Sequence, residues 1–90
     1  MLVIRKNCGK DEVTDFEFNQ NGCEFLVKNF TSGDVYVSLD ETFNKDKAIK
    51  LPTNTYQIVA YKYNKRDFMT KTVKVQAETA GEVEVQMTLW

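Results

Sequence analysis

The sequence predicts an all-β protein, an antiparallel β-sandwich of seven or eight strands with an immunoglobulin-like or jelly-roll-like arrangement. Short runs of alternating apolar and polar residues recur roughly every 8 to 12 residues, a spacing typical of sandwiches and barrels. Gly, Asn and Asp residues of the kind that form turns separate these runs. No segment shows the i, i+3, i+4 apolar spacing of an amphipathic helix of two turns.

The chain is expected to form a single domain over residues 1–90. It has 90 residues, of which 42% are apolar, and a formal net charge of −1. A chain of this size buries only about 60 to 65% of its unfolded surface, which is enough for one hydrophobic core and not for two. No linker, internal repeat or low-complexity stretch divides it.

The first two runs, Leu2–Lys6 and Val13–Phe18, are predicted to pair as strands across a turn-forming segment. In the second run Phe16 and Phe18 share one face and acidic residues occupy the other, which indicates a half-buried strand. The dipeptide Asn21-Gly22 then predicts a hairpin to the third run, because both residues tolerate the positive φ of tight hairpin turns.

The third run, Phe25–Phe30, has apolar residues on both faces, so we expect it in the middle of a sheet. The fourth run, Val35–Leu39, follows the residues Thr31-Ser32-Gly33-Asp34. These predict a hairpin in which Gly33 supplies the positive φ. The polar residues 40–48 are expected to form a loop or at most one helical turn.

The remaining runs alternate in the same way. Lys47–Leu51 is a short strand that ends at Pro52, since Pro donates no backbone hydrogen bond. Thr55–Tyr63 is rich in β-branched and aromatic residues. Glu82–Trp90 follows Thr70–Glu78 and ends the sequence, so we expect it at an uncovered sheet edge. The alternative is a place inside a sheet, beside Thr70–Glu78. The apolar faces predict a core of Phe25, Val27, Val35, Val37, Ile58, Val73, Val75, Val83, Val85 and Met87.

The residue types exclude most catalytic chemistry. The chain contains no His and two Cys, so zinc sites of the usual spacing and His-based triads cannot form within one chain. The first acids, including Asp15 and Glu17, alternate with apolar residues on a solvent face, where solvated carboxylates are commoner than a catalytic pair. No Gly-rich phosphate loop is present. We therefore expect no enzymatic activity, no cofactor and no metal centre.

Two structural questions stay open at this point, whether calcium binds to acids within residues 34–46 and whether Cys8 bonds to Cys23. The spacing of an EF-hand is missing, and small secreted scaffolds usually carry more cysteines. In the first residues, Met-Leu-Val-Ile-Arg-Lys, the apolar stretch is followed at once by charged residues and is too short for a signal peptide or a membrane span. We expect a product that is made in the cytoplasm and has no membrane partner.

Aromatic and cationic residues interleave between Tyr61 and Phe68. Stacked rings and cations together hold single-stranded nucleic acid. The overall charge of −1 disfavours that partner, because cations at a hairpin tip are usually only solvated. Rings with polar tips also suit sugars. A module that binds glycan or nucleic acid is therefore the alternative to the preferred interpretation, a structural or interaction module.

Charge is segregated along the chain, with cations concentrated between residues 47 and 75 and acids on either side. Opposite patches can bring copies of a chain together. The preferred interpretation is that neighbouring strands of one chain neutralise each other; in the alternative, the outward acids of the last run meet the cationic tract Lys62–Lys74 of a neighbouring copy. The predicted interaction surface comprises Tyr61, Tyr63, Lys65, Arg66, Phe68, Glu82, Glu84 and Trp90.

The segment Phe25–Tyr63, with FLVKNFTSGDVYVS followed by KAIKLP and YQIVAY, resembles parts of short β-rich structural proteins of tailed bacteriophages and prophages. An apolar strand, a Thr-x-Gly-Asp turn and a Tyr-Val-Ser strand recur there in this order. The resemblance covers under half of the chain. It implies a virion component, such as a head decoration, fibre or head-tail protein, that acts by self-association or by docking on partner proteins.

Overall fold

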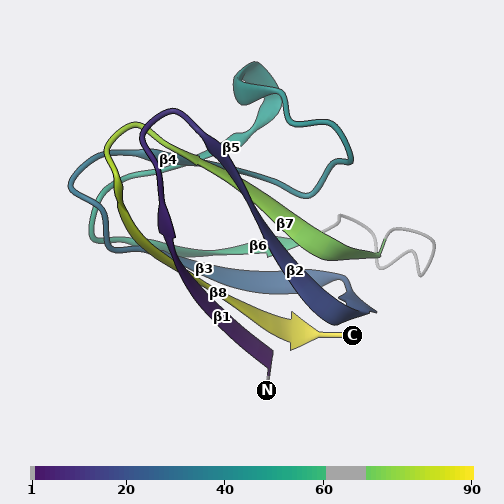
Figure 1. The fold of residues 1–90 in the computed structure, drawn as a ribbon. Coiled ribbons are helices and arrows are strands. Elements are labelled where there is room, and N and C mark those ends of the chain that lie inside the picture. Colours follow the sequence, from purple (N-terminus) through teal and green to yellow (C-terminus); the bar gives the residue numbers. More distant parts are fainter. Residues whose placement is uncertain (1, 61–68) are drawn as a thin grey trace.

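The computed structural model describes residues 2–60 and 69–90, which form eight strands in two four-stranded antiparallel sheets (Figure 1). The sheets pack face to face, which confirms the predicted β-sandwich. The first sheet has the order β1 (Leu2–Cys8), β8 (Gly81–Leu89), β3 (Glu24–Asn29) and β6 (Tyr56–Ala60). The second has the order β2 (Val13–Gly22), β7 (Thr70–Ala77), β4 (Val35–Ser38) and β5 (Ile49–Leu51).

The strands pair as nested partners, first with last. β1 pairs with β8, β2 with β7, β3 with β6, and β4 with β5. Such nesting describes one long hairpin, and the additional pairings of β3 with β8 and β4 with β7 wrap it into two sheets. This is the eight-stranded jelly roll, one of the two arrangements that the sequence allows.

The predicted local hairpins are wrong. β1 and β2 lie in different sheets, as do β2 and β3, and β3 and β4. The two strands of each pair bury their apolar faces in the same core from opposite sides, and turn-forming residues serve such a crossing as well as a hairpin. Positive φ occurs at Asp11 and Asn54 and at no described Gly, so the φ predicted for Gly33 is also wrong.

The hairpin predicted at Asn21-Gly22 does not form, and the position of Gly22 in the structure gives the reason. Gly22 is the last residue of β2, where it pairs with Thr70 of β7. A Cβ atom at this position would lie 2.6 Å from the sulfur of Met87, a buried residue of β8. Close packing between the two sheets therefore explains this Gly.

The expectation that the last strand lies at an uncovered edge is wrong as well. β8 lies between β1 and β3, in the middle of the first sheet. The alternative of a place beside β7 is also wrong, because β7 belongs to the second sheet. The edge of β8 that faces away from β3 is covered by β1, the first strand of the chain. The prediction of a central third run is confirmed, since β3 lies between β8 and β6.

All the predicted core residues except Ile58 are buried. Ile58 is 57% exposed, whereas its neighbour Val59 is 3% exposed. Val59 lies opposite Phe25 of β3, which is fully buried, and directly opposed residues share a face of the sheet. The pairing register with β3, which the alternation within β6 does not reveal, therefore turns Val59 inward. Phe16 and Phe18 share the buried face of β2, as predicted.

The long connection from β4 to β5 contains one short helical turn, η1 (Lys45–Lys47), in agreement with the sequence. The side chain of Asn44 caps it by accepting a 3.0 Å hydrogen bond from the Asp46 N–H. Pro52 follows the last residue of β5, also as predicted.

A fully buried Asn29 fixes the crossing from β3 to β4. Its amide nitrogen donates to the carbonyl oxygens of Gly33 (2.9 Å) and Leu51 (3.0 Å). Its side-chain oxygen accepts from the backbone N–H (2.9 Å) and the hydroxyl (2.7 Å) of Thr31. Every hydrogen-bonding position of this side chain is thus used, and the loop after β3 is tied to the end of β5.

The register of β6 predicts opposite effects for one substitution at two adjacent positions. Val59→Asp places an unpaired carboxylate in the core and is expected to lower the free energy of unfolding by roughly 3 to 5 kcal/mol. Ile58→Asp leaves the carboxylate in water and is expected to change it by less than about 1 kcal/mol. Urea unfolding of both variants measures the difference. Similar losses at the two positions would contradict the register.

The Asn29 network predicts that Asn29→Asp destabilises the fold although it preserves the shape of the side chain. A carboxylate cannot donate to the two carbonyl oxygens, and its charge stays buried, so we expect a loss of about 2 to 4 kcal/mol. Asn19→Asp, at an exposed position of β2, is the matched control. Thermal unfolding that shifts equally in the two variants would remove the structural role assigned to Asn29.

Candidate interaction surface

The structure describes three of the eight residues of the predicted interaction surface. Tyr61, Tyr63, Lys65, Arg66 and Phe68 lie outside the described residues, so their predicted role stays a prediction. Of the other members, Glu82 is exposed on β8, Trp90 is 59% exposed directly after it, and Glu84 is 4% exposed. The three described members therefore lie on β8 or directly after it, in the first sheet.

The outer face of the first sheet is built from two rows of directly opposed residues. One row runs Val3, Gln86, Leu26, Ile58 across β1, β8, β3 and β6. The next row runs Arg5, Glu84, Lys28, Tyr56 over the same strands. Both rows face away from the core, because the residues that alternate with them on β8 and β3, such as Val85 and Val27, are fully buried. We call these eight residues the outer face.

Glu84 is the centre of this face. One carboxylate oxygen accepts hydrogen bonds from Arg5, at 2.5 Å from Nη2 and 3.1 Å from Nε. The other oxygen accepts from Gln86 Nε2 at 2.8 Å and lies 3.3 Å from Lys28 Nζ. Cations from the two neighbouring strands thus hold one buried acid, which is the condition under which a buried charge is stable.

These donors lower the pKa of Glu84 to about 2, because hydrogen bonds from Arg5 first, and then from Gln86 and Lys28, favour the carboxylate over burial, which opposes them. The acid is occupied within its own chain. The expectation that Glu84 pairs with cations of a neighbouring copy depended on an edge position that β8 does not have. Glu82 stays exposed, with its carboxylate 3.7 Å from Arg5 Nε.

Exposed apolar side chains gather around the same sheet. Among the described residues seven large apolar side chains are exposed, and six of them belong to the first sheet or directly follow its strands. A monomeric protein exposes single apolar residues at many places, but a cluster on one sheet is typical of a contact surface. The six residues are Val3, Phe30, Tyr56, Ile58, Leu89 and Trp90.

The outer side of the second sheet is polar, and several of its polar groups pair within the chain. Lys74 Nζ lies 3.1 Å from Asp15, and Lys50 Nζ lies 3.3 Å from Asp34. The Tyr36 hydroxyl donates to Glu78 at 2.8 Å. Val13 is the one exposed large apolar residue that the described part of this sheet contributes. The two faces of the sandwich therefore differ in kind.

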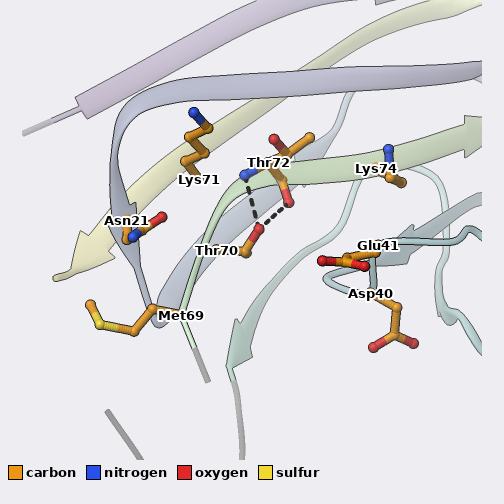
Figure 2. Close-up of a pocket in the computed structure, with 8 residues that line it drawn as sticks. All are labelled: Asn21, Asp40, Glu41, Met69, Thr70, Lys71, Thr72 and Lys74. Carbon is orange, nitrogen blue, oxygen red and sulfur yellow. Dashed lines mark hydrogen bonds between the residues drawn. The ribbon is translucent and has the colours of Figure 1, made fainter. Parts of the chain in front are cut away.

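A hollow of about 290 Å³ lies where β2 ends and β7 begins, beside residues 40 and 41 (Figure 2). Met69 is its one apolar lining residue; Asn21, Asp40, Glu41, Thr70, Lys71, Thr72 and Lys74 complete the lining. Figure 2 shows the Thr70 hydroxyl engaged with the backbone of Thr72, to whose C=O it donates (3.2 Å) and from whose N–H it accepts (3.1 Å). Pockets for organic ligands are mostly apolar and measure about 300 to 1,000 Å³, so this hollow does not favour such a ligand.

The open questions about cysteine and metal have partial answers. Cys8 is buried and Cys23 half-buried, and both are free thiols. Burial raises the pKa of the Cys8 thiol. Within residues 2–60 and 69–90 no cluster of three acidic, Cys or His side chains is suited to a metal ion, so the described acids of residues 34–46 form no such calcium site. The same residues contain no helix long and apolar enough to span a bilayer.

Comparison with known proteins assigns no family. No family model, no curated protein and no solved structure matches the chain.

The residues that give the outer face its character are not among those that the sequence predicts for an interaction surface, apart from Glu84. Arg5 and Lys28 neutralise Glu84 only because β1 and β3 flank β8, and this arrangement joins strands far apart in the sequence. Tyr56 shares a face of β6 with Ile58, and the alternation of the sequence predicts Ile58 for the core. The usable signal was the opposition of charge between the first and last strands, which becomes informative once their pairing is known.

Glu84 predicts a pH dependence of stability. Its pKa is lowered from 4.5 to about 2 in the folded state, so its contribution is present above pH 4.5 and is lost as pH falls toward 2. We expect Glu84→Gln to lose roughly 2 to 3 kcal/mol at neutral pH and to lack this part of the acid-induced loss. Urea unfolding between neutral pH and pH 2 measures it. Glu82→Gln, an exposed change on the same strand, is the control; parallel pH profiles for parent and Glu84→Gln would contradict the assignment.

Proposed function

We propose that the protein is a non-enzymatic structural module that acts by binding other proteins through the first sheet. The observation that supports this is the difference between the two faces. Six of the seven exposed large apolar side chains among the described residues belong to the first sheet or directly follow its strands, and three of them, Val3, Tyr56 and Ile58, share the outer face with the ion-paired Glu84. Ion pairs occupy the second sheet instead. Interfaces between proteins combine apolar residues with satisfied polar ones in this way.

Two further points favour binding over catalysis. The chain contains no His, and the best-buried acid, Glu84, is held as a carboxylate by three donors of its own chain. A catalytic acid or base needs a pKa near the working pH, and a pKa of about 2 does not meet that need.

The setting that we propose is the virion of a tailed bacteriophage or prophage, where the protein would serve as a head decoration, fibre or head-tail component. The resemblance of residues 25–63 to such proteins supports this. Jelly rolls occur in viral capsid domains and equally in lectins, so the fold is compatible with this setting without selecting it.

Because jelly rolls also occur in lectins, the fold is equally compatible with the second candidate, a module that binds glycan or nucleic acid. The observation in its favour is the exposure of aromatic rings at Tyr56 (72%) and Trp90 (59%), because sugars and bases stack on such rings. Three hollows lined by described residues measure about 290, 190 and 200 Å³, below the usual size of a ligand pocket, and this favours the protein partner.

A matched pair of substitutions tests the proposal. Val3→Asp on β1 of the first sheet and Val13→Asp on β2 of the second alter equally exposed Val residues, at 46% and 45%, on the two opposite faces. The proteins that adjacent genes encode are purified singly and titrated with each variant. We expect one of them to bind the parent and Val13→Asp alike, and Val3→Asp at least about tenfold more weakly. A glycan array and a nucleic-acid gel shift at low salt are expected to be negative. Binding to either, with no binding to the proteins, would support the second candidate instead.

A further inference from the structure

Each sheet has two edge strands, and most of these edges are protected. An edge exposes unpaired backbone N–H and C=O groups, and natural proteins protect it with charge, Pro, a bulge or shortness. β1 carries Arg5 and Lys6. β2 carries two acids and an irregular register between Glu17 and Gly22. β5 has three residues, including Lys50, and is followed by Pro52.

β6 is the exception among the four described edges. Its residues Tyr-Gln-Ile-Val-Ala include no charge, no Pro and no Gly, and its register with β3 is unbroken. Four of the five are exposed. Uncharged segments of high β propensity are those that pair most readily with another strand.

The backbone groups that β6 directs outward can be identified. The N–H of Asn29, at the end of β3, donates to the C=O of Thr55 at 2.9 Å, while the N–H of Phe30 donates to the C=O of Glu82 in β8 at 3.0 Å. Successive residues of β3 therefore bond alternately to β6 and β8. In this register Gln57 and Val59 bond to β3. The N–H and C=O groups of Tyr56, Ile58 and Ala60 point to the open side.

We propose that β6 pairs antiparallel with β6 of a second copy, with the two-fold axis at Ile58, so that two four-stranded sheets join into one of eight strands. This inference rests on the proposed function, since it names a second copy of the chain as the protein that the first sheet binds.

The pairing is complementary to itself. With Ile58 on the axis, Ile58 faces Ile58 of the second copy, and the large Tyr56 faces the small Ala60. Each of these pairs uses the outward backbone groups, which gives about six hydrogen bonds. The apolar residues Leu26 and Ile58 of each copy then continue one row across both chains. No charge of β6 opposes the contact.

The contact is small, so we expect a reversible dimer of micromolar or weaker affinity rather than a permanent one. The axis gives a sharp test, because residue 58 faces its own counterpart. Ile58→Asp and Ile58→Lys are each expected to weaken self-association at least about tenfold, because like charges then face each other about 5.5 Å apart at the Cα atoms. An equal mixture of the two variants is expected to form a mixed dimer of opposite charges.

Sedimentation velocity from low micromolar to millimolar concentration measures the parent, each variant and the mixture. Val13→Asp and Val13→Lys, on the second sheet, are the controls and are expected to dimerise like the parent, alone and mixed. A parent that stays monomeric throughout overturns the inference. Variants that dimerise like the parent would overturn pairing at Ile58. A mixture of the two variants that dimerises no better than either variant alone would overturn it as well.

Failure of this inference is distinguishable from failure of the proposed function. Val3 lies on β1, at the opposite edge of the sheet from β6. A monomeric parent whose binding to another protein is still weakened by Val3→Asp would remove the dimer and leave the proposed function standing. A monomer that binds none of those proteins would remove both.

Discussion

The hydrogen bonds of Asn29 are the interaction on which the arrangement of the strands depends. Consecutive strands lie in different sheets at every step except from β4 to β5. A chain that crosses between sheets brings backbone polar groups into buried positions, where each needs a partner. At the crossing after β3, Asn29 supplies partners for Thr31, Gly33 and Leu51 at once. Its own N–H and C=O bond to Thr55 and Asn54.

These bonds set the position of β6. Asn54, which has a positive φ of 57°, and Thr55 immediately precede it, and both are bonded to the backbone of Asn29. The register of β6 against β3 continues from this point, which turns Val59 into the core and Ile58 out of it. The exposure of the outer face on this side of the sheet thus follows from one buried amide.

The fold class could be predicted from the sequence because alternation is a local property. The spacing of Val83, Val85 and Met87 is enough to predict that they share the buried face of a strand, and they are buried as expected. Pairing could not be predicted in the same way. Gly22 and Gly33 resemble turn residues, yet the first is explained by the sulfur of Met87 and neither has a positive φ. The partners of Glu84 are similarly remote, since Arg5 is 79 residues away in the chain.

The first sheet combines a fixed centre with an open margin. At its centre, Glu84 and its cations join β1, β8 and β3 and satisfy the polar groups of one row. At its margin, β6 has neither the charge nor the Pro that protects the other described edges. A rigid face beside an unprotected strand suits assembly, because a partner strand can add to the sheet without any change in its centre.

Residue-resolved amide exchange in β6 tests most directly whether this edge is open and is used for assembly. In dilute protein we expect protection of Gln57 and Val59, whose N–H groups bond to β3, and rapid exchange at Tyr56, Ile58 and Ala60. At high concentration these three amides should become protected together. Equal protection of all five in dilute solution would show that the edge is closed within one chain. No gain of protection at high concentration would show that a second copy does not pair there.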